Sequence, residues 1–198
     1  MAKQVADLCG LVLAGGRSQR MGRDMATLIY RGQLQVDRAV RLLRYRCESV
    51  FVSLRPEQDN PTTDGATAIH DRFGEIGPFG GILSAFFYYR EKSFFVCSCA
   101  LPFIDLPLVN HLIENRDPTR FATLIARPDG SPEPLFGIYE NAYKSVFLDA
   151  AKKGERDLEA IIGTQDIAIV EAPDPAALDG VWTNQEYYEA QKRIMGVG

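Results

Sequence analysis

The sequence predicts an α/β protein, a three-layer sandwich in which helices cover both faces of a mostly parallel sheet. Two observations support this prediction. Segments with the length of strands alternate along the chain with segments of helical pattern, and the expected strands are apolar throughout. Uniformly apolar strands are buried on both faces, as they are in parallel sheets between layers of helices. Because the chain has 198 residues, one domain spanning 1–198 is expected.

The first part of the chain contains both kinds of element. Short apolar runs predict strands at residues 8–13, 50–54, 66–69 and 93–99. Hydrophobic residues at mostly helical offsets, with arginines on the other side, predict a helix over 33–46. Glycines open an apolar segment that is expected to be helical over 80–89, and a further helix is expected over 106–115.

The rest of the chain continues this alternation. Strands are expected at residues 121–126, 135–139 and 167–170, with turn residues over 128–132 between the first two. A helix over 143–153 is closed by Gly154 at its C′ position, and lysines in its last turn suit the helix dipole. A short helix is expected over 157–162, and Thr183 is expected to cap a final helix that ends near residue 194.

Composition and charge exclude several classes of protein. Hydrophobic residues make up 46% of the chain, which argues against disorder. The net charge is −4 and basic residues are scattered outside the first 46 positions, so no nucleic-acid partner is expected. There is no signal-peptide pattern and no apolar run of about 20 residues, so a cytoplasmic protein without a membrane partner is expected. Four dispersed cysteines predict no disulfide framework, and Cys97 and Cys99 are expected to be reduced core thiols.

Three loops are predicted to form the functional site, because ligands of such sheets bind outside the carboxyl ends of the strands. These loops are residues 14–25, 71–81 and 100–105. The first one reads Ala-Gly-Gly-Arg-Ser-Gln-Arg-Met-Gly-Arg-Asp-Met and follows an apolar strand directly. It matches neither of the two common phosphate-loop patterns.

The residue types of this loop nevertheless suit an anionic ligand. Gly15 and Gly16 lack side chains, so backbone N–H groups can approach a phosphate closely. Permanent positive charge comes from Arg17, Arg20 and Arg23. Ser18 adds a hydroxyl donor. The sequence therefore predicts a nucleotide-phosphate site at the end of the first strand.

The string Leu-Ala-Gly-Gly-Arg-Ser-Gln-Arg-Met-Gly-Arg-Asp at 13–24 resembles the opening signature of the molybdenum cofactor guanylyltransferases. Further blocks are similar to segments of that family in the same order, namely residues 70–72 with 77–82, residues 100–103 and residues 134–139. The resemblance spans residues 8–190, and its first block is the specific one. It implies a nucleotide-diphospho-sugar transferase-like, Rossmann-like fold and the transfer of GMP from GTP to molybdopterin with release of pyrophosphate.

The resemblance also implies substrates, partners and site residues. GTP is the implied nucleotide substrate, molybdopterin the second substrate and Mg²⁺ the metal, and a protein partner in cofactor biosynthesis is a further expectation. Arg20 and Asp24 are the expected catalytic residues. The expected nucleotide-binding positions are Leu13, Ala14, Gly15, Gly16, Arg17, Ser18, Arg20, Met25, Asp71, Gly80 and Ala100.

Three places depart from the family pattern. Met25 stands where the family has a lysine, and Ala100 stands where it has an aspartate that binds Mg²⁺. Residues 180–184 keep only the threonine of a late family motif. An alanine offers no oxygen to a hard cation. The remaining candidate metal ligands are Asp24, Asp71 and Asp105.

Both substituted positions are expected to face an open cleft, since they follow the ends of strands. Neither Met25 nor Ala100 can supply charge, so guanylyl transfer is expected to be very slow or absent. Replacing them together by lysine and aspartate is expected to strengthen Mg²⁺-dependent nucleotide binding.

Three functions stay open at this point. The first is a guanylyltransferase, or a close relative using another nucleotide, that works with displaced metal ligands and has weak activity. The second is a nucleotide-binding protein without turnover in a regulatory or partner role. The third is a related cytidylyl or sugar-nucleotide transferase. The paired glycines disfavour the last of these. Two residues are also left with two interpretations each: Arg55 faces the nucleotide cleft or solvent, and Trp182 lies over a ligand or fills the core.

Overall fold

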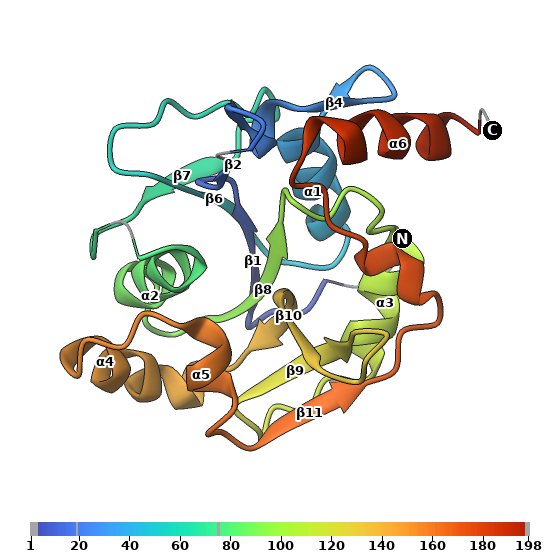
Figure 1. The fold of residues 1–198 in the computed structure, drawn as a ribbon. Coiled ribbons are helices and arrows are strands. Elements are labelled where there is room, and N and C mark those ends of the chain that lie inside the picture. Colours follow the sequence, from blue (N-terminus) through green and yellow to red (C-terminus); the bar gives the residue numbers. More distant parts are fainter. Residues whose placement is uncertain (1–3, 19, 75, 197–198) are drawn as a thin grey trace.

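The computed structural model describes residues 4–18, 20–74 and 76–196, apart from the side chains of residues 17 and 18. Seven strands form one sheet in the order β11-β9-β10-β8-β1-β6-β7 (Figure 1). They are β1 (Leu8–Leu13), β6 (Val50–Leu54), β7 (Thr67–His70), β8 (Ser93–Ser98), β9 (Ala122–Ala126), β10 (Pro132–Tyr139) and β11 (Ile167–Val170). Strand β10 runs antiparallel to both of its neighbours, and all other pairs are parallel. The predicted mostly parallel sheet is confirmed.

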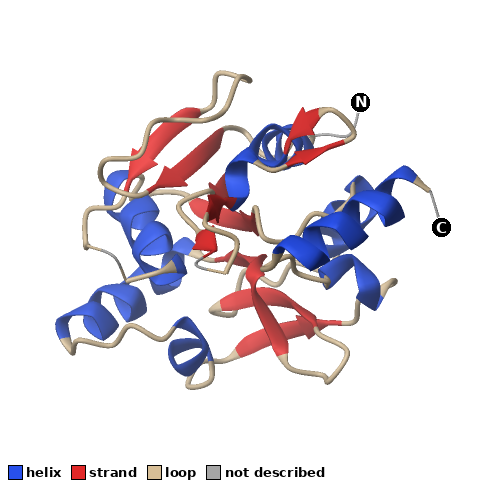
Figure 2. Ribbon diagram, turned by 45° about the horizontal axis from the view of Figure 1, so that its top comes forward, coloured by secondary structure: helices blue, strands red, loops and turns tan. Residues whose placement is uncertain are grey.

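Six helices flank the sheet: α1 (Gln35–Arg44), α2 (Pro78–Tyr88), α3 (Leu106–Glu114), α4 (Lys144–Lys152), α5 (Leu158–Ile162) and α6 (Asn184–Met195). Helices α1, α3 and α6 pack on one face, and α2, α4 and α5 pack on the other (Figures 1 and 2). Side chains of β1 alternate between the two cores, with Leu8 and Val12 in one and Leu11 and Leu13 in the other. Burial on both faces is why this strand is apolar throughout. The predicted three-layer sandwich is confirmed.

Several short elements of the structure were not predicted from the sequence. Two-residue strands form two small hairpins, β2 (Arg17–Ser18) with β3 (Arg23–Asp24) and β4 (Ile29–Tyr30) with β5 (Gln33–Leu34). Three 3₁₀ turns are also present, η1 (Met25–Thr27), η2 (Asn141–Tyr143) and η3 (Pro175–Leu178). Because residues 33 and 34 pair in a hairpin, the first long helix begins two residues later than the expected 33–46.

Other boundaries differ for identifiable reasons. Helix α2 begins at Pro78 instead of residue 80, because a proline suits the first helical position. Strand β10 begins at Pro132 instead of residue 135, and its register with β9 shifts before Gly137. Prolines are tolerated in strands at β-bulges and at the first strand position, and Pro132 and Pro134 lie in this irregular first part of β10.

The predicted helix caps are present. Thr183 and Glu186 form a capping box at the start of α6, in which each side chain binds the backbone of the other residue. Gly154 has φ +77° just after α4, as its predicted C′ position requires. Cys97 and Cys99 are buried free thiols, as expected. Among the described residues, no helix is long and apolar enough to cross a membrane.

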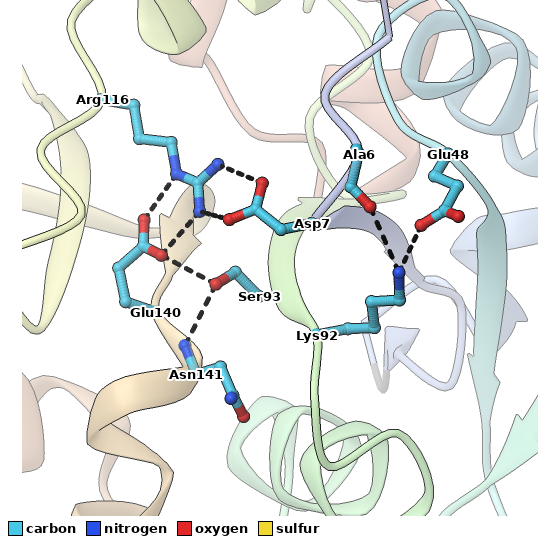
Figure 3. Close-up of polar contacts among 8 residues, drawn as sticks. All are labelled: Ala6, Asp7, Glu48, Lys92, Ser93, Arg116, Glu140 and Asn141. Atoms are coloured by element: carbon cyan, nitrogen blue, oxygen red, sulfur yellow. Dashed lines mark hydrogen bonds and ion pairs between the residues drawn. The ribbon is translucent and has the colours of Figure 1, made fainter.

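A buried ion-pair network ties the strands together at the amino edge of the sheet (Figure 3). The guanidinium of Arg116 binds both oxygens of Glu140, each at 2.7 Å, and both oxygens of Asp7 at 3.1 Å. Ser93 Oγ donates to Glu140 at 2.7 Å and accepts from the N–H of Asn141 at 3.1 Å. The side chains of Arg116 and Glu140 are only 10% and 4% exposed. Residues before β1, at the start of β8 and after β10 are thereby held in place.

We predict that Arg116→Met lowers the free energy of unfolding by about 3–5 kcal/mol, because it leaves the buried Glu140 carboxylate without its cation. Urea denaturation monitored by circular dichroism measures the loss. The control is Arg120→Met, which removes an exposed arginine paired with Asp117 and Asp166 and is expected to cost less than about 1 kcal/mol. Equal losses in the two variants would contradict the prediction.

Candidate functional site

The glycine loop, residues 14–25, leaves the sheet at its centre. It follows β1, which lies between β8 and β6. Backbone hydrogen bonds carry both strand pairings up to the loop: Ala14 N–H donates to the Ser53 carbonyl at 2.9 Å, and Cys99 N–H donates to the Leu13 carbonyl at 3.2 Å. The loop therefore lies at the carboxyl ends of three parallel strands, where ligands of such sheets bind.

Three successive carbonyl groups of the glycine loop accept hydrogen bonds from the protein. Gln58 Nε2 donates to Ala14 O at 3.1 Å, Arg55 Nη1 to Gly15 O at 2.5 Å, and Met25 N to Gly16 O at 3.3 Å. In contrast, the N–H groups of the two glycines donate to no acceptor within the described ranges. Adjacent unpaired N–H groups form a concave site for an anion or another acceptor oxygen.

Close packing, not backbone twist, requires glycine at positions 15 and 16. Neither residue has a positive φ, unlike Gly22 at φ +65°. A Cβ on Gly16 would lie 2.5 Å from Met25 Cε, and a Cβ on Gly15 would lie 3.3 Å from the backbone nitrogen of Arg55. A side chain at position 15 would press on the Arg55 backbone, and one at position 16 would displace the end of the Met25 side chain.

Arg55 faces the glycine loop, which resolves the alternative that the sequence left open. Its Nη2 lies 3.1 and 3.2 Å from the two carboxylate oxygens of Asp24, and both side chains are less than one-third exposed. Gln58 has a similar role and was missed by the sequence prediction. The available signal was the position of both residues just after the 50–54 strand, at the same edge as the loop.

The start of α6 lies against the glycine loop. Arg23 Cζ is 5.5 Å from the ring centroid of Tyr187, a cation–π contact. Hydrogen bonds from the backbone N–H groups of Trp182 and Thr183 lower the pKa of Glu186, and the charge of Arg20 adds to this effect. Arg23 therefore contacts α6, and Arg20 lies close enough for its charge to act on Glu186.

Trp182 does not fill the core, since 40% of it is exposed. A Cβ on Gly180 would lie 2.5 Å from Trp182 Nε1, so the indole ring folds back against the Gly180 backbone. The side chains of Arg17 and Ser18 lie outside the described part of the chain, and their expected contacts stay predictions.

Asp71 and Gly80 lie together beside the end of β1, as their expected shared ligand requires. A Cβ on Gly80 would lie 3.4 Å from Asp71 Oδ2, and one on Gly81 would lie 3.1 Å from Leu13 Cδ2. Ser53 Oγ donates to Asp71 Oδ1 at 3.2 Å. Burial nevertheless raises the pKa of Asp71 to about 6. A carboxyl group with a strongly raised pKa at the predicted edge is typical of a functional site.

Met25 and Ala100 do not face an open cleft, and that expectation is wrong. They are 5% and 0% exposed, and both belong to the core on the α1, α3 and α6 side of the sheet. The η1 turn directs Met25 inward beneath Gly16. Ala100 is held by two hydrogen bonds, from its N–H to Ser98 Oγ at 3.1 Å and to its carbonyl from Val181 N–H at 2.9 Å. Apolar packing has occupied both positions.

The residues present do not fit the Mg²⁺ that the resemblance implies. Ala100 offers no oxygen, and the Asp24 carboxylate is paired with Arg55. The Asp105 carboxylate caps α3 by accepting from Leu108 N–H at 2.9 Å, and it lines a separate hollow of about 270 Å³ together with Arg193. Asp71 accepts a hydrogen bond from Ser53 and is the one candidate carboxylate that neither pairs with an arginine nor caps a helix in the described part of the chain. Across 4–18, 20–74 and 76–196, no three His, Cys, Asp or Glu side chains gather into a group that could hold a metal ion.

Comparison with known proteins gives a consistent set of relatives. Residues 10–169 match the family model described as the MobA-like NTP transferase domain. A probable molybdenum cofactor guanylyltransferase of Mycobacterium tuberculosis is 30% identical over 186 residues, covering 91% of this chain and 92% of the relative. A molybdenum cofactor biosynthesis bifunctional protein of Synechocystis is 36% identical over 149 residues, covering 74% of this chain and 43% of that protein.

Solved structures show the same fold. Molybdopterin-guanine dinucleotide biosynthesis protein A from Archaeoglobus fulgidus superposes with a TM-score of 0.79 at 17% identity, covering 95% of this chain and 99% of the other. A 2-C-methyl-D-erythritol 4-phosphate cytidylyltransferase from Thermus thermophilus superposes with a TM-score of 0.70 at 16% identity, covering 98% and 100%. The predicted nucleotide-diphospho-sugar transferase-like fold is confirmed.

The raised pKa of Asp71 predicts a pH-dependent stability. Because the folded state holds this proton more tightly than the unfolded chain, stability is lost as the pH rises from about 4 to about 6. Asp71→Asn should therefore raise the free energy of unfolding at pH 7.5 by about 1–3 kcal/mol and leave it unchanged near pH 4. The exposed control Asp59→Asn should change it by less than about 0.5 kcal/mol. Chemical denaturation at both pH values is the measurement, and a destabilised Asp71→Asn at pH 7.5 would contradict the prediction.

The burial of Ala100 predicts that Ala100→Asp destabilises the protein by about 3 kcal/mol or more, because a carboxylate would enter the core without a partner. Thermal unfolding with and without Mg²⁺ is the measurement. The control, Ala160→Asp on the exposed side of α5, should leave the melting temperature nearly unchanged. A normal melting temperature that Mg²⁺ raises further would show that position 100 reaches a metal-binding cleft after all.

Proposed function

The chain belongs to the MobA-like NTP transferase family, and we propose that it binds GTP and transfers the GMP group to molybdopterin, releasing pyrophosphate. The observation that carries this proposal is the glycine loop at the centre of the carboxyl edge, whose two glycine N–H groups have no acceptor among the described residues. The names of the similar guanylyltransferases support the choice of GTP and molybdopterin. A protein partner in cofactor biosynthesis and a cytoplasmic location are further expectations of the same proposal.

In this proposal an oxygen of molybdopterin is the nucleophile and attacks the α-phosphorus of GTP. The bond from the α-phosphorus to the oxygen that bridges to the β-phosphate breaks, and pyrophosphate leaves. Leu13, Asp71 and Gly80 lie together and would contact the nucleoside, while the N–H groups of the glycine loop would hold acceptor oxygens of the nucleotide. Arg20 is exposed at the loop and would stabilise charge on the phosphates. Asp24 would act through Arg55, its partner in the structure.

We propose that this transfer is slow. Losing one preorganised charge from an active site commonly costs about 10²–10³ in rate. Met25 and Ala100 replace two charged residues of the family pattern and are packed in the core. No step of the proposed reaction is assigned to Mg²⁺.

A second function, nucleotide binding without turnover, is favoured by one specific observation. Met25 and Ala100 fill space with apolar atoms while the shape of the glycine loop is kept. Retention of the loop without its chemistry suits a regulatory or partner subunit. The cytidylyl alternative shares the fold with the Thermus cytidylyltransferase, and the paired glycines of the loop argue against it.

We predict that the wild-type protein binds GTP more tightly than CTP or ATP, and that Gly16→Val weakens binding because the new side chain would displace the end of Met25 beneath the loop. Isothermal titration with and without Mg²⁺ measures binding, and pyrophosphate release from GTP with purified molybdopterin measures transfer. Slow pyrophosphate release would support the guanylyltransferase function. Binding of GTP without any pyrophosphate release would support the nucleotide-binding function without turnover. A preference for CTP would assign the chain to the cytidylyl enzymes, and no binding at millimolar nucleotide would refute both leading functions.

A further inference from the structure

We propose that Arg55 is the positioning residue of the nucleotide site, which it prepares by fixing the direction of the Gly16 N–H group. The inference deepens the proposed function and rests on it. It assigns to the end of β6 a role that neither the loop pattern nor the paired glycines predict.

The contacts of Arg55 join the two ends of the glycine loop. Nη1 donates to the carbonyl of Gly15 at 2.5 Å, and Nη2 donates to both oxygens of Asp24 at 3.1 and 3.2 Å. Charge-assisted hydrogen bonds of this kind are about twice as strong as neutral ones. Gln58 is placed by the same turn, since its Oε1 accepts from the backbone N–H of Arg55 at 3.2 Å.

Planarity of the peptide bond converts these carbonyl contacts into a direction for the neighbouring N–H groups. In a trans peptide the C=O of one residue and the N–H of the next point to opposite sides. Arg55 holds the Gly15 carbonyl and thereby turns the Gly16 N–H away from itself, and Gln58 does the same for the Gly15 N–H through Ala14. Both are the glycine N–H groups that find no acceptor among the described residues.

The glycines make such a support necessary. Without a Cβ atom, each glycine has access to many more backbone conformations than other residues, including those with the peptide plane reversed. A reversed 15–16 peptide would present a carbonyl oxygen to the nucleotide where an N–H group is needed. The guanidinium stabilises one of these orientations, and Asp24 keeps the guanidinium in place.

The test compares Arg55→Ala, Arg55→Lys and Asp24→Asn with the wild type by isothermal titration with GTP. Arg55→Ala should raise Kd by about 10- to 100-fold, the range expected for losing a hydrogen bond from a charged group. Arg55→Lys should recover part of the affinity, because an ammonium group reaches one of the two partners. The matched control is Arg41→Ala, which removes a similar arginine–aspartate pair with Asp64 on the outside of α1 and should leave Kd unchanged.

Two further readouts separate positioning from a merely structural role. Guanidinium ion at millimolar concentration should restore part of the GTP affinity of Arg55→Ala and should leave Arg41→Ala unaffected. Hydrogen–deuterium exchange of the loop peptide should be faster in Arg55→Ala, while exchange of the β1 core stays at the wild-type rate.

The outcomes are distinct. Wild-type affinity in a folded Arg55→Ala would overturn the positioning role and leave the proposed function intact. If Arg55→Ala does not fold, Arg55→Lys and Asp24→Asn decide, and wild-type affinity in both would overturn it. A wild-type protein that binds no GTP would instead refute the proposed function, whatever the variants do.

Discussion

The hydrogen bond from Arg55 to the Gly15 carbonyl joins the end of β6 to the glycine loop that follows β1. Strands β1 and β6 are parallel neighbours, paired up to Leu13 and Ser53, so both chains leave the sheet at the same level. Arg55, the first residue after β6, therefore lies beside the glycines that follow β1. Because paired glycines have little stiffness of their own, the loop takes its shape from the sheet. Its distance from the core is set from the other side by Met25, packed against Gly16.

Some residues at this edge of the sheet stabilise the fold, and one residue destabilises it. Met25 and Ala100 add apolar packing, and Ala100 also anchors Val181 at the approach to α6. Asp71 remains a half-buried carboxyl group whose pKa is raised, which costs stability at neutral pH. Apolar side chains stand at the two positions where the resemblance implies charged ones, while a carboxyl group that costs stability stands at residue 71. Such a cost is expected where a side chain serves a ligand.

The sequence predicts the layers well, because burial on both faces requires uniformly apolar strands and because caps such as Thr183 and Gly154 act locally. It could not predict that β10 runs antiparallel, since an apolar strand looks the same in either direction. The strands of the two small hairpins have two residues each, too few to produce a periodic pattern. The sequence pattern also predicts the glycine loop, Asp71 and Gly80 as site residues, and the structure brings these three to one edge of the sheet. The packing of Ala100 and the direction of Arg55 depend on contacts with residues more than 30 positions away, which no local pattern records.

The same contacts bear on how a nucleotide would be held. The resemblance implies a lysine at residue 25 and a metal-binding aspartate at residue 100, both near the phosphates. Here those positions are closed by the core, and the remaining groups that suit an anion are backbone N–H groups and arginines. Guanidinium groups keep their charge at any physiological pH and need no metal to bind phosphate. Under the proposed function, recognition of a nucleotide by such groups does not depend on a metal ion, because binding and transfer use different atoms. The proposal therefore combines slow transfer with selection of the nucleotide in the same chain.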